Sequence, residues 1–273
     1  MALFELRDGG RMVYESAGQG PALVFVPGWA GGGNLFARQR DALADQFTVV
    51  TVNLRGQGGC SAVPTDQGLE TLGDDLVQLC EALSLEAPIL VGWSMGAMVV
   101  WRALLAASPV PAAGAVIIDM VPRLLNDADW KHGLIEGADA RVFDYAMKAM
   151  VASWPAYMAA VVSGILAADS PQQPLLDELL ETSLACDPDS MARLWASMVN
   201  QDFRTDLAAM ELPTLVAHGG RSQLYSRAAA QWLAAALPDG RRVEFGDSGH
   251  APHMEQPDSF NAALVEFAND LRG

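Results

Sequence analysis

Residues 87–107 decide the fold of this chain, and they read APILVGWSMGAMVVWRALLAA. The short apolar run from Ile89 to Val91 is typical of a buried strand, and the apolar stretch after Gly96 is typical of a helix. Between them, residues 92–96 have the pattern Gly-x-Ser-x-Gly, which places a serine on a strained turn from strand to helix. Both glycines are needed because a side chain there would collide with the neighbouring strand and helix. The context therefore predicts a nucleophile elbow with Ser94 at its tip.

The composition describes a globular chain. With 273 residues, of which 51% are hydrophobic and 18% charged, the chain can bury a sizeable core. Its net charge of −16 argues against nucleic acid or an anionic membrane surface as a partner. The start of the chain lacks the basic and apolar segments of a signal peptide, and charged or turn residues interrupt every apolar stretch before it could cross a bilayer. We therefore expect a cytoplasmic protein, a monomer or homodimer, that acts on a small molecule.

The three cysteines, Cys60, Cys80 and Cys186, are odd in number and widely spaced. Such spacing disfavours a disulfide framework or a zinc site. Cys80 fits the apolar rhythm of a helix, where a thiol acts as a small core side chain. The sequence therefore predicts neither a metal nor a cofactor.

Strands alternate with helices along most of the chain. An opening hairpin is expected over residues 3–6 and 12–15, and the continuous apolar run at residues 22–26 is typical of a strand buried on both faces. Further strands are expected at residues 47–52, 89–91, 115–118, 214–217 and 241–245. This alternation predicts an α/β fold with a mostly parallel sheet and helices on both faces.

The β pattern disappears between residues 121 and 209, where three or four amphipathic helical segments are expected. Residues 1–120 and 210–273 are therefore predicted to form the core, and residues 121–209 a helical cap inserted into it. We expect the cap to lie over the carboxyl edge of the sheet, where ligands bind in folds of this kind.

Three further motifs resemble those of the α/β-hydrolase superfamily and occur in its usual order. Pro27-Gly28-Trp29 resembles the His-Gly oxyanion loop, residues 53–58 resemble the Asp-x-Arg-Gly-x-Gly turn, and residues 248–257 resemble the Gly-His-x-x-x-x-Glu-x-Pro segment. Together with the elbow and the inserted helices, the resemblance covers the whole chain and implies an α/β-hydrolase fold. Within the superfamily, Gly28-Trp29 and the elbow are most similar to the pimeloyl-carrier-protein methyl ester esterases of biotin synthesis.

A serine hydroxyl is a poor nucleophile until a base removes its proton. His250 is the candidate base, because it follows a strand, a short turn and Gly249, so that its ring can reach over the elbow. A histidine on a surface loop is the structural alternative. In an elbow of this kind the backbone N–H of Met95 is one oxyanion donor, and the resemblance points to Trp29 for the other. Pro27 stands where the superfamily usually has a histidine. Because the donor is a main-chain N–H group, we expect this change to leave the oxyanion hole, the pair of N–H donors, intact.

The acid that orients His250 is not at its usual place in the superfamily. That position falls on Ser222, and the loop that follows His218 lacks a carboxylate. His218 closes a strand, so we expect it to have a structural role. A serine cannot supply the charge that stabilises an imidazolium. The strand before the insertion ends in Asp119, and the run before it resembles that of certain haloalkane dehalogenases, which carry their acid at that strand tip. The sequence thus favours Asp119, with a non-catalytic aspartate here, another carboxylate or no acid as the alternatives.

The insertion is rich in methionine and tryptophan, which at helical spacing most often pack a core. Those that line a cleft would suit apolar acyl groups. The candidate pocket residues are Trp29, Trp93, Met120, Trp130, Met147 and Trp154. The insertion also carries six Lys or Arg against thirteen Asp or Glu. An acidic acyl carrier protein would need the opposite sign of charge, so a free small ester is favoured.

These features predict a serine hydrolase that cleaves carboxylic esters of apolar or medium-sized acyl groups through an acyl-enzyme, with Ser94, His250 and Asp119 as its triad. Thioesterase, lactonase and C–C bond hydrolase activities would use related intermediates. A cofactor-free haloperoxidase or perhydrolase and a non-catalytic ligand receptor stay open, because fold alone does not decide function. Dehalogenase and epoxide-hydrolase chemistries are excluded, since the relatives that carry them have an aspartate at the elbow.

Overall fold

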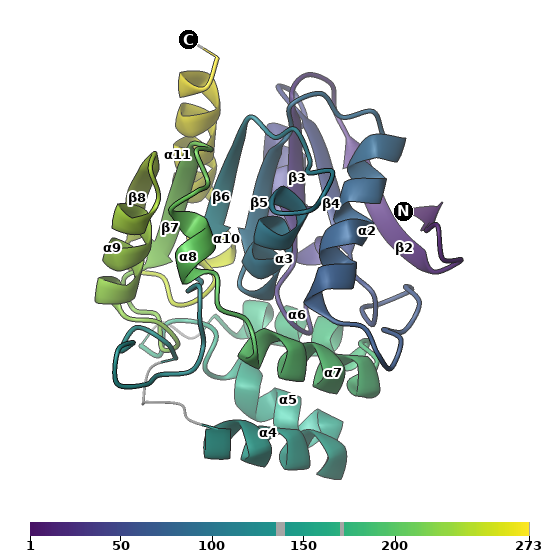
Figure 1. Ribbon diagram of the computed structural model, residues 1–273, viewed down its shortest axis with the longest axis vertical. Helices are drawn as coiled ribbons and strands as arrows, with labels where there is room; N and C mark the ends of the chain where they lie inside the picture. The colour runs from purple at the N-terminus through teal and green to yellow at the C-terminus, as the bar shows by residue number, and fades with distance from the viewer. Residues whose placement is uncertain (135–139, 170–171, 273) are drawn as a thin grey trace.

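One eight-stranded sheet forms the centre of the molecule, a computed structural model that describes residues 1–134, 140–169 and 172–272 (Figure 1). The strand order is β1-β2-β4-β3-β5-β6-β7-β8. Both pairings of β2 are antiparallel and all other neighbours are parallel, which confirms the predicted hairpin and the mostly parallel sheet. The strands are β1 (Ala2–Glu5), β2 (Arg11–Ala17), β3 (Ala22–Val26), β4 (Thr48–Asn53), β5 (Ile89–Trp93), β6 (Gly114–Ile118), β7 (Thr214–Gly219) and β8 (Gly240–Phe245).

The central strands are apolar because both of their faces are covered. Every residue of β3, β5 and β6 is buried. Parallel pairing sets Trp93 opposite Ile118, which are the last residues of β5 and β6. The residues that follow them, Ser94 and Asp119, therefore leave the sheet beside each other at its carboxyl edge.

Helices cover both faces of the sheet. α2 (Leu69–Ala82) and α3 (Met95–Leu104) pack against each other on the face toward the viewer in Figure 1. α1 (Ala37–Leu43) follows a short 3₁₀ helix, η1 (Gly33–Phe36), and contacts α11 (Pro257–Asp270) on the opposite face. α9 (Arg227–Ala236) packs on β7 and β8, and the short α10 (Pro252–Glu255) precedes α11. Among the described helices, none is long and apolar enough to span a membrane.

A group of helices follows β6 and lies below the sheet in Figure 1. It consists of α4 (Ala140–Ala152), α5 (Trp154–Val162), α6 (Gln173–Leu184) and α7 (Pro188–Val199), which we call the cap helices, with the short α8 (Arg204–Leu207) before β7. The ring of Trp29, three residues after β3, contacts Trp154 on α5 and Trp195 on α7. The cap helices therefore lie at the carboxyl edge of the sheet. The division of the chain into core and cap domains at residues 121 and 209 stays a prediction.

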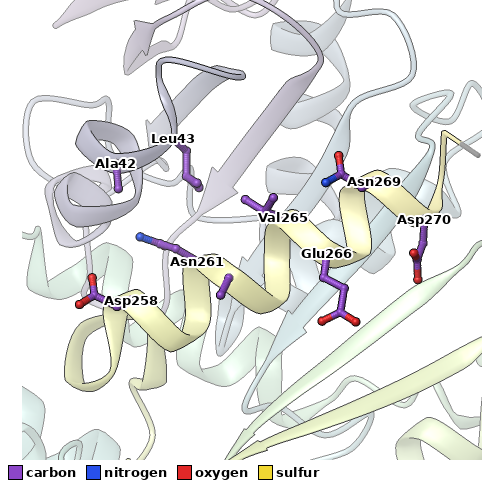
Figure 2. Close-up of a pocket in the computed structure, with 9 residues that line it drawn as sticks. Ala42, Leu43, Asp258, Asn261, Val265, Glu266, Asn269 and Asp270 are labelled. Carbon is purple, nitrogen blue, oxygen red and sulfur yellow. The ribbon is translucent and has the colours of Figure 1, made fainter.

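A groove of about 640 Å³ lies between α1 and α11 (Figure 2). Ala42 and Leu43 line it from α1, and polar side chains such as Asp258 and Asn269 line it from α11. None of its lining residues is among the predicted site residues.

Candidate active site

The turn that carries Ser94 is strained and tightly enclosed. Ser94 has φ 53° and ψ −123°, a conformation that side-chain-bearing residues rarely adopt. A Cβ on Gly92 would lie 2.6 Å from the backbone of Ala97, and one on Gly96 would lie 2.1 Å from the Val26 carbonyl oxygen. The Ser94 N–H donates to the Ile118 carbonyl at 3.0 Å, which ties the turn to β6. The serine is thus held at the sheet edge, half-buried, by backbone packing that only glycine allows at residues 92 and 96.

Asp119 accepts hydrogen bonds from two histidines. Its Oδ2 lies 2.7 Å from Nδ1 of His250 and its Oδ1 lies 2.7 Å from Nδ1 of His218. The Ser222 hydroxyl donates to Oδ2 at 2.6 Å, and the Gly219 N–H points at Oδ1 from 3.4 Å. Asp119 also has a positive φ of 44°, which turns its side chain across the ends of β6 and β7. The structure therefore brings Asp119 and His250 together and adds three further partners to the carboxylate: His218, Ser222 and the Gly219 N–H.

These partners keep the buried carboxylate ionised. Burial disfavours the charge of Asp119, but the hydrogen bonds from His218 and His250 outweigh burial, and the pKa of Asp119 lies below its ordinary value. Because Asp119 is then an acceptor only, each histidine presents an Nδ1–H to it, and Nε2 of His250 is left as the basic nitrogen.

The loop that carries His250 is anchored on both sides. The His250 N–H donates to the Ile165 carbonyl at 2.7 Å, and the indole N–H of Trp93 donates to the His250 carbonyl at 2.8 Å. Glu255 accepts from the N–H of Gly249 at 2.8 Å. The glutamate of the Gly-His-x-x-x-x-Glu motif thus holds the backbone beside the histidine.

Sequence reasoning missed the roles of His218 and Ser222. The sequence predicts a structural role for His218 and gives no sign that its imidazole contacts Asp119. Ser222 occupies the position where the superfamily usually has its acid, and its hydroxyl reaches the aspartate that stands on the neighbouring strand tip. The clue in the sequence was the missing carboxylate at residue 222, because a serine there can donate to a relocated acid.

The two predicted oxyanion donors are Met95, which follows Ser94 directly, and Trp29, which follows Gly28 in the loop after β3. Met95 is the first residue of α3, so its N–H has no partner within the helix. Gly28 packs on the serine so closely that a Cβ there would lie 3.2 Å from the Ser94 Cβ. Within the described residues, no acceptor takes the Trp29 backbone N–H, whereas the Trp29 indole N–H donates to the Met191 carbonyl on α7 at 2.8 Å.

The predicted pocket residues do not all gather at one place. The ring of Trp29 contacts Trp154, Tyr157 and Trp195, with ring centroids 5.6, 6.3 and 5.4 Å away, and we call these four residues the aromatic cluster. Trp93 is buried against the rings of His250 and His253.

The other three pocket candidates, Trp130, Met120 and Met147, do not belong to the aromatic cluster. Trp130 packs against Trp232 of α9, with ring centroids 4.7 Å apart. Met120 is buried and its sulfur accepts from the Tyr225 hydroxyl at 3.2 Å. Met147 is half-buried on α4. The structure thus joins Trp29 and Trp154 but does not bring Trp130 to them.

His253 is a buried histidine whose ring is enclosed by aromatic side chains. Phe36 and Trp93 lie 4.7 and 4.9 Å from it between ring centroids, and neither of its ring nitrogens has a hydrogen-bond partner within the described residues. Burial, together with the charges of His250 and Arg38, lowers the pKa of His253 well below its ordinary value. The folded protein therefore holds this imidazole neutral.

We predict that His253→Phe makes the protein less sensitive to mild acid. Because only the unfolded chain protonates His253 below about pH 6.5, the free energy of unfolding of the wild type falls as the pH drops through that value. One such proton corresponds to a slope of about 1.4 kcal/mol per pH unit. Urea unfolding at pH 7.5 and 5.5 measures this slope, which should be smaller in the variant. Equal slopes in the two proteins would show that other groups govern the acid sensitivity.

The comparisons with known proteins agree with this architecture. A serine on a strand-to-helix elbow at the carboxyl edge of a mostly parallel sheet is the arrangement found in α/β enzymes that place a nucleophile on such an elbow. A model of the alpha/beta hydrolase fold family matches residues 21–257. The chain belongs to this family, which confirms the predicted fold class.

Curated relatives and a solved structure match nearly the whole chain. It is 26% identical over 257 residues to the pimeloyl-[acyl-carrier protein] methyl ester esterase of Chromobacterium violaceum, covering 92% of this chain and 96% of the relative. It is 29% identical over 265 residues to the enzyme of the same name from Stenotrophomonas maltophilia, covering 95% and 97%. The structure of an esterase from Exiguobacterium antarcticum has the same fold, with a TM-score of 0.91, 20% identity and 99% of both chains covered.

Proposed function

We propose that Ser94, His250 and Asp119 form a catalytic triad that hydrolyses carboxylic esters of apolar or medium-sized acyl groups. The chain is a carboxylic ester hydrolase, in agreement with its family and its relatives. The observation that carries the triad is the buried Asp119 carboxylate, 2.7 Å from Nδ1 of His250 at the strand tip next to Ser94.

The reaction follows from this geometry. Ser94 Oγ attacks the ester carbonyl while Nε2 of His250 takes its proton, and ionised Asp119 stabilises the imidazolium that forms. The N–H groups of Trp29 and Met95 receive the negative charge on the carbonyl oxygen. His250 then gives its proton to the leaving alkoxide, which departs as the alcohol. Water, activated by His250, attacks the acyl-enzyme by the same route and releases the acid.

The aromatic cluster favours an apolar acyl group. The single polar group of the Trp29 side chain is used by the Met191 carbonyl, so the ring offers only apolar surface to a ligand. Burial raises the pKa of Tyr157 to about 12, so its hydroxyl stays neutral. A cleft bounded by these rings would take hydrocarbon rather than charge.

We also infer that the substrate is free rather than bound to an acyl carrier protein. The segment that would face such a partner, residues 121–209, carries thirteen acidic and six basic side chains. An acidic carrier would be repelled by this balance of charge. The relatives named for carrier-bound substrates therefore share the reaction type with this chain rather than the partner.

We predict that p-nitrophenyl ester turnover peaks at one acyl length between acetyl and dodecanoyl. The peak would mark the acyl group that fits the site best, and Ser94→Ala should reduce turnover to the background rate, because no other group replaces the nucleophile. Initial rates for both proteins across the series measure this. Ser84→Ala is the matched control, since Ser84 also has a positive φ, of 50°, but is exposed and lies outside the site.

Two results would overturn this function. Equal rates for wild type and Ser94→Ala would exclude a serine esterase. Rates on thioesters, lactones or β-diketones that exceed ester rates, and still require Ser94, would reassign the bond that is cleaved and retain the triad.

A further inference from the structure

Gln57 is a buried side chain that the proposed reaction does not use, yet it contacts the oxyanion loop. Its amide is 1% exposed. Nε2 donates to the Gly28 carbonyl at 2.8 Å, and Oε1 accepts from the Leu54 N–H at 2.8 Å. The Gly28 carbonyl can only accept and the Leu54 N–H can only donate, so the two partners fix which end of the Gln57 amide is oxygen and which is nitrogen. The amide is therefore locked between its own turn and the loop after β3.

The Gly28 carbonyl and the Trp29 N–H belong to one peptide unit. A trans peptide is planar, and its C=O and N–H point in opposite directions. No cis peptide bond occurs in the described residues. Because Gln57 fixes the direction of the Gly28 oxygen, the Trp29 N–H must point the opposite way, away from the Gln57 amide. Gly28 itself lies against Ser94, since a Cβ on Gly28 would come within 3.2 Å of the Ser94 Cβ, so this peptide unit borders the proposed nucleophile.

The turn that carries Gln57 is itself rigidly held. The neighbouring Arg55 is paired with buried Asp75 through two hydrogen bonds, of 2.6 and 2.9 Å. The Gln57 N–H closes the turn on the Leu54 carbonyl at 3.0 Å. The turn that positions Gln57 against the oxyanion loop is therefore itself held in place by hydrogen bonds.

Without Gln57, the donor that the described residues leave to the Gly28 carbonyl comes from its own loop. The Gly28 carbonyl has one further donor, the Gly31 N–H at 3.1 Å, which belongs to the same glycine-rich loop. Ala30 between them has φ 54°, a conformation that costs energy for alanine. Rotation of the peptide would point the Gly28 oxygen at the place where the oxyanion forms and would remove one of its two donors.

From these contacts we propose that Gln57 is a positioning residue for the oxyanion hole, which sets the direction of the Trp29 N–H through the Gly28 carbonyl. This rests on the proposed function, because it assigns a role within the same hydrolysis. Gln57 touches no reacting atom, and its effect is exerted entirely through the backbone of the loop.

Gln57→Glu is the sharpest test, because it keeps the acceptor for Leu54 and replaces the donor to Gly28 by a second oxygen. We expect kcat to fall about 100-fold, the loss typical of one oxyanion donor, with KM changed less than about 3-fold. The affinity for an alkyl trifluoromethyl ketone, which adds to the serine and forms an oxyanion, should fall by the same factor.

The pH dependence separates positioning from general damage. At low pH the introduced carboxyl is protonated and can donate to Gly28 again, so the ratio of variant to wild-type kcat should rise as the pH falls. Gln57→Met has no such proton, so its ratio should stay low at every pH.

Gln39→Glu is the matched control: Gln39 is 0% exposed and donates to the His253 carbonyl at 2.8 Å, but it does not touch the oxyanion loop. That variant should keep kcat within about 3-fold of wild type while unfolding at a lower temperature.

The outcomes distinguish this inference from the function on which it rests. Turnover that requires Ser94 but is unchanged in Gln57→Glu and Gln57→Met would overturn the role of Gln57 alone. Equal losses in the Gln39 and Gln57 variants would also overturn it, since loss of any buried amide would then have the same effect. Wild-type turnover that does not need Ser94 would overturn both the function and the inference.

Discussion

Asp119→Asn is expected to lower kcat about 10⁴-fold, the loss that follows when the acid of a Ser-His-Asp triad becomes an amide. An amide has no charge to stabilise the imidazolium, and its NH₂ end would face an Nδ1–H of His218 or His250, which forces one ring into the wrong tautomer. The backbone should not change, because asparagine tolerates the positive φ of residue 119 better than most residues. Single-turnover acylation and steady-state rates on the best p-nitrophenyl ester measure the loss.

A second substitution should restore part of this activity. The Ser222 hydroxyl lies 2.6 Å from the carboxylate oxygen that His250 contacts, so an aspartate at residue 222 would present its charge to the same imidazole. We expect Asp119→Asn with Ser222→Asp to recover about 100-fold, since restored charge outweighs imperfect geometry. Asp127→Asn, on the half-exposed loop after β6, is the control and should leave the rate unchanged. A loss of less than 10-fold in Asp119→Asn would place the acid elsewhere.

Asp75→Ala is expected to lower the free energy of unfolding by about 3–5 kcal/mol, because it leaves the Arg55 guanidinium buried without its partner. The two side chains are 1% and 3% exposed, and Arg55 contacts both oxygens of Asp75. Hydrogen bonds with Asp75 raise the pKa of Arg55, while burial raises the pKa of Asp75. The bidentate geometry is that of an ion pair, so we take both groups as ionised.

Two matched variants separate the buried pair from the surface contact of the same arginine. Asp8 also binds Arg55, at 2.8 Å, but its side chain is 43% exposed, and Asp8→Asn should cost less than about 1 kcal/mol. Replacing both buried partners, as Arg55→Met with Asp75→Leu, should regain most of the lost stability because no buried charge remains. Urea unfolding at pH 7.5 measures all four proteins. A similar loss for Asp8→Asn and Asp75→Ala would show that burial contributes little.

This ion pair explains a motif that the sequence showed only as a resemblance. The arginine of the Asp-x-Arg-Gly-x-Gly turn anchors the turn to α2 through Asp75, and Gln57 in the same turn reaches the oxyanion loop. One short segment thus connects the stability of the core with the geometry proposed for catalysis. Asp75→Ala should therefore reduce kcat as well as stability.

The elements of the sheet and the elbow followed from local sequence. The residues of β3, β5 and β6 are all buried, as their apolar runs predict. A side chain at residue 92 or 96 would collide with the neighbouring backbone, so both positions require glycine. Asp119 and His250 could be named because each follows a recognisable strand end. Such signals involve residues close in the chain, where backbone preference and side-chain periodicity act.

Only the tertiary structure decided which side chains meet around these residues. His218 and Ser222 join Asp119 across about 100 residues of chain, and Gln57 meets Gly28 across 29. Trp93 turned inward against His250, and Trp130 paired with Trp232 away from the aromatic cluster. These contacts depend on strand order, on register and on how the cap helices sit against the core. Local sequence patterns do not specify the strand order, the register or the packing of the cap helices. Side chains distant in the chain become hydrogen-bond partners only when the packed elements bring them within about 3 Å.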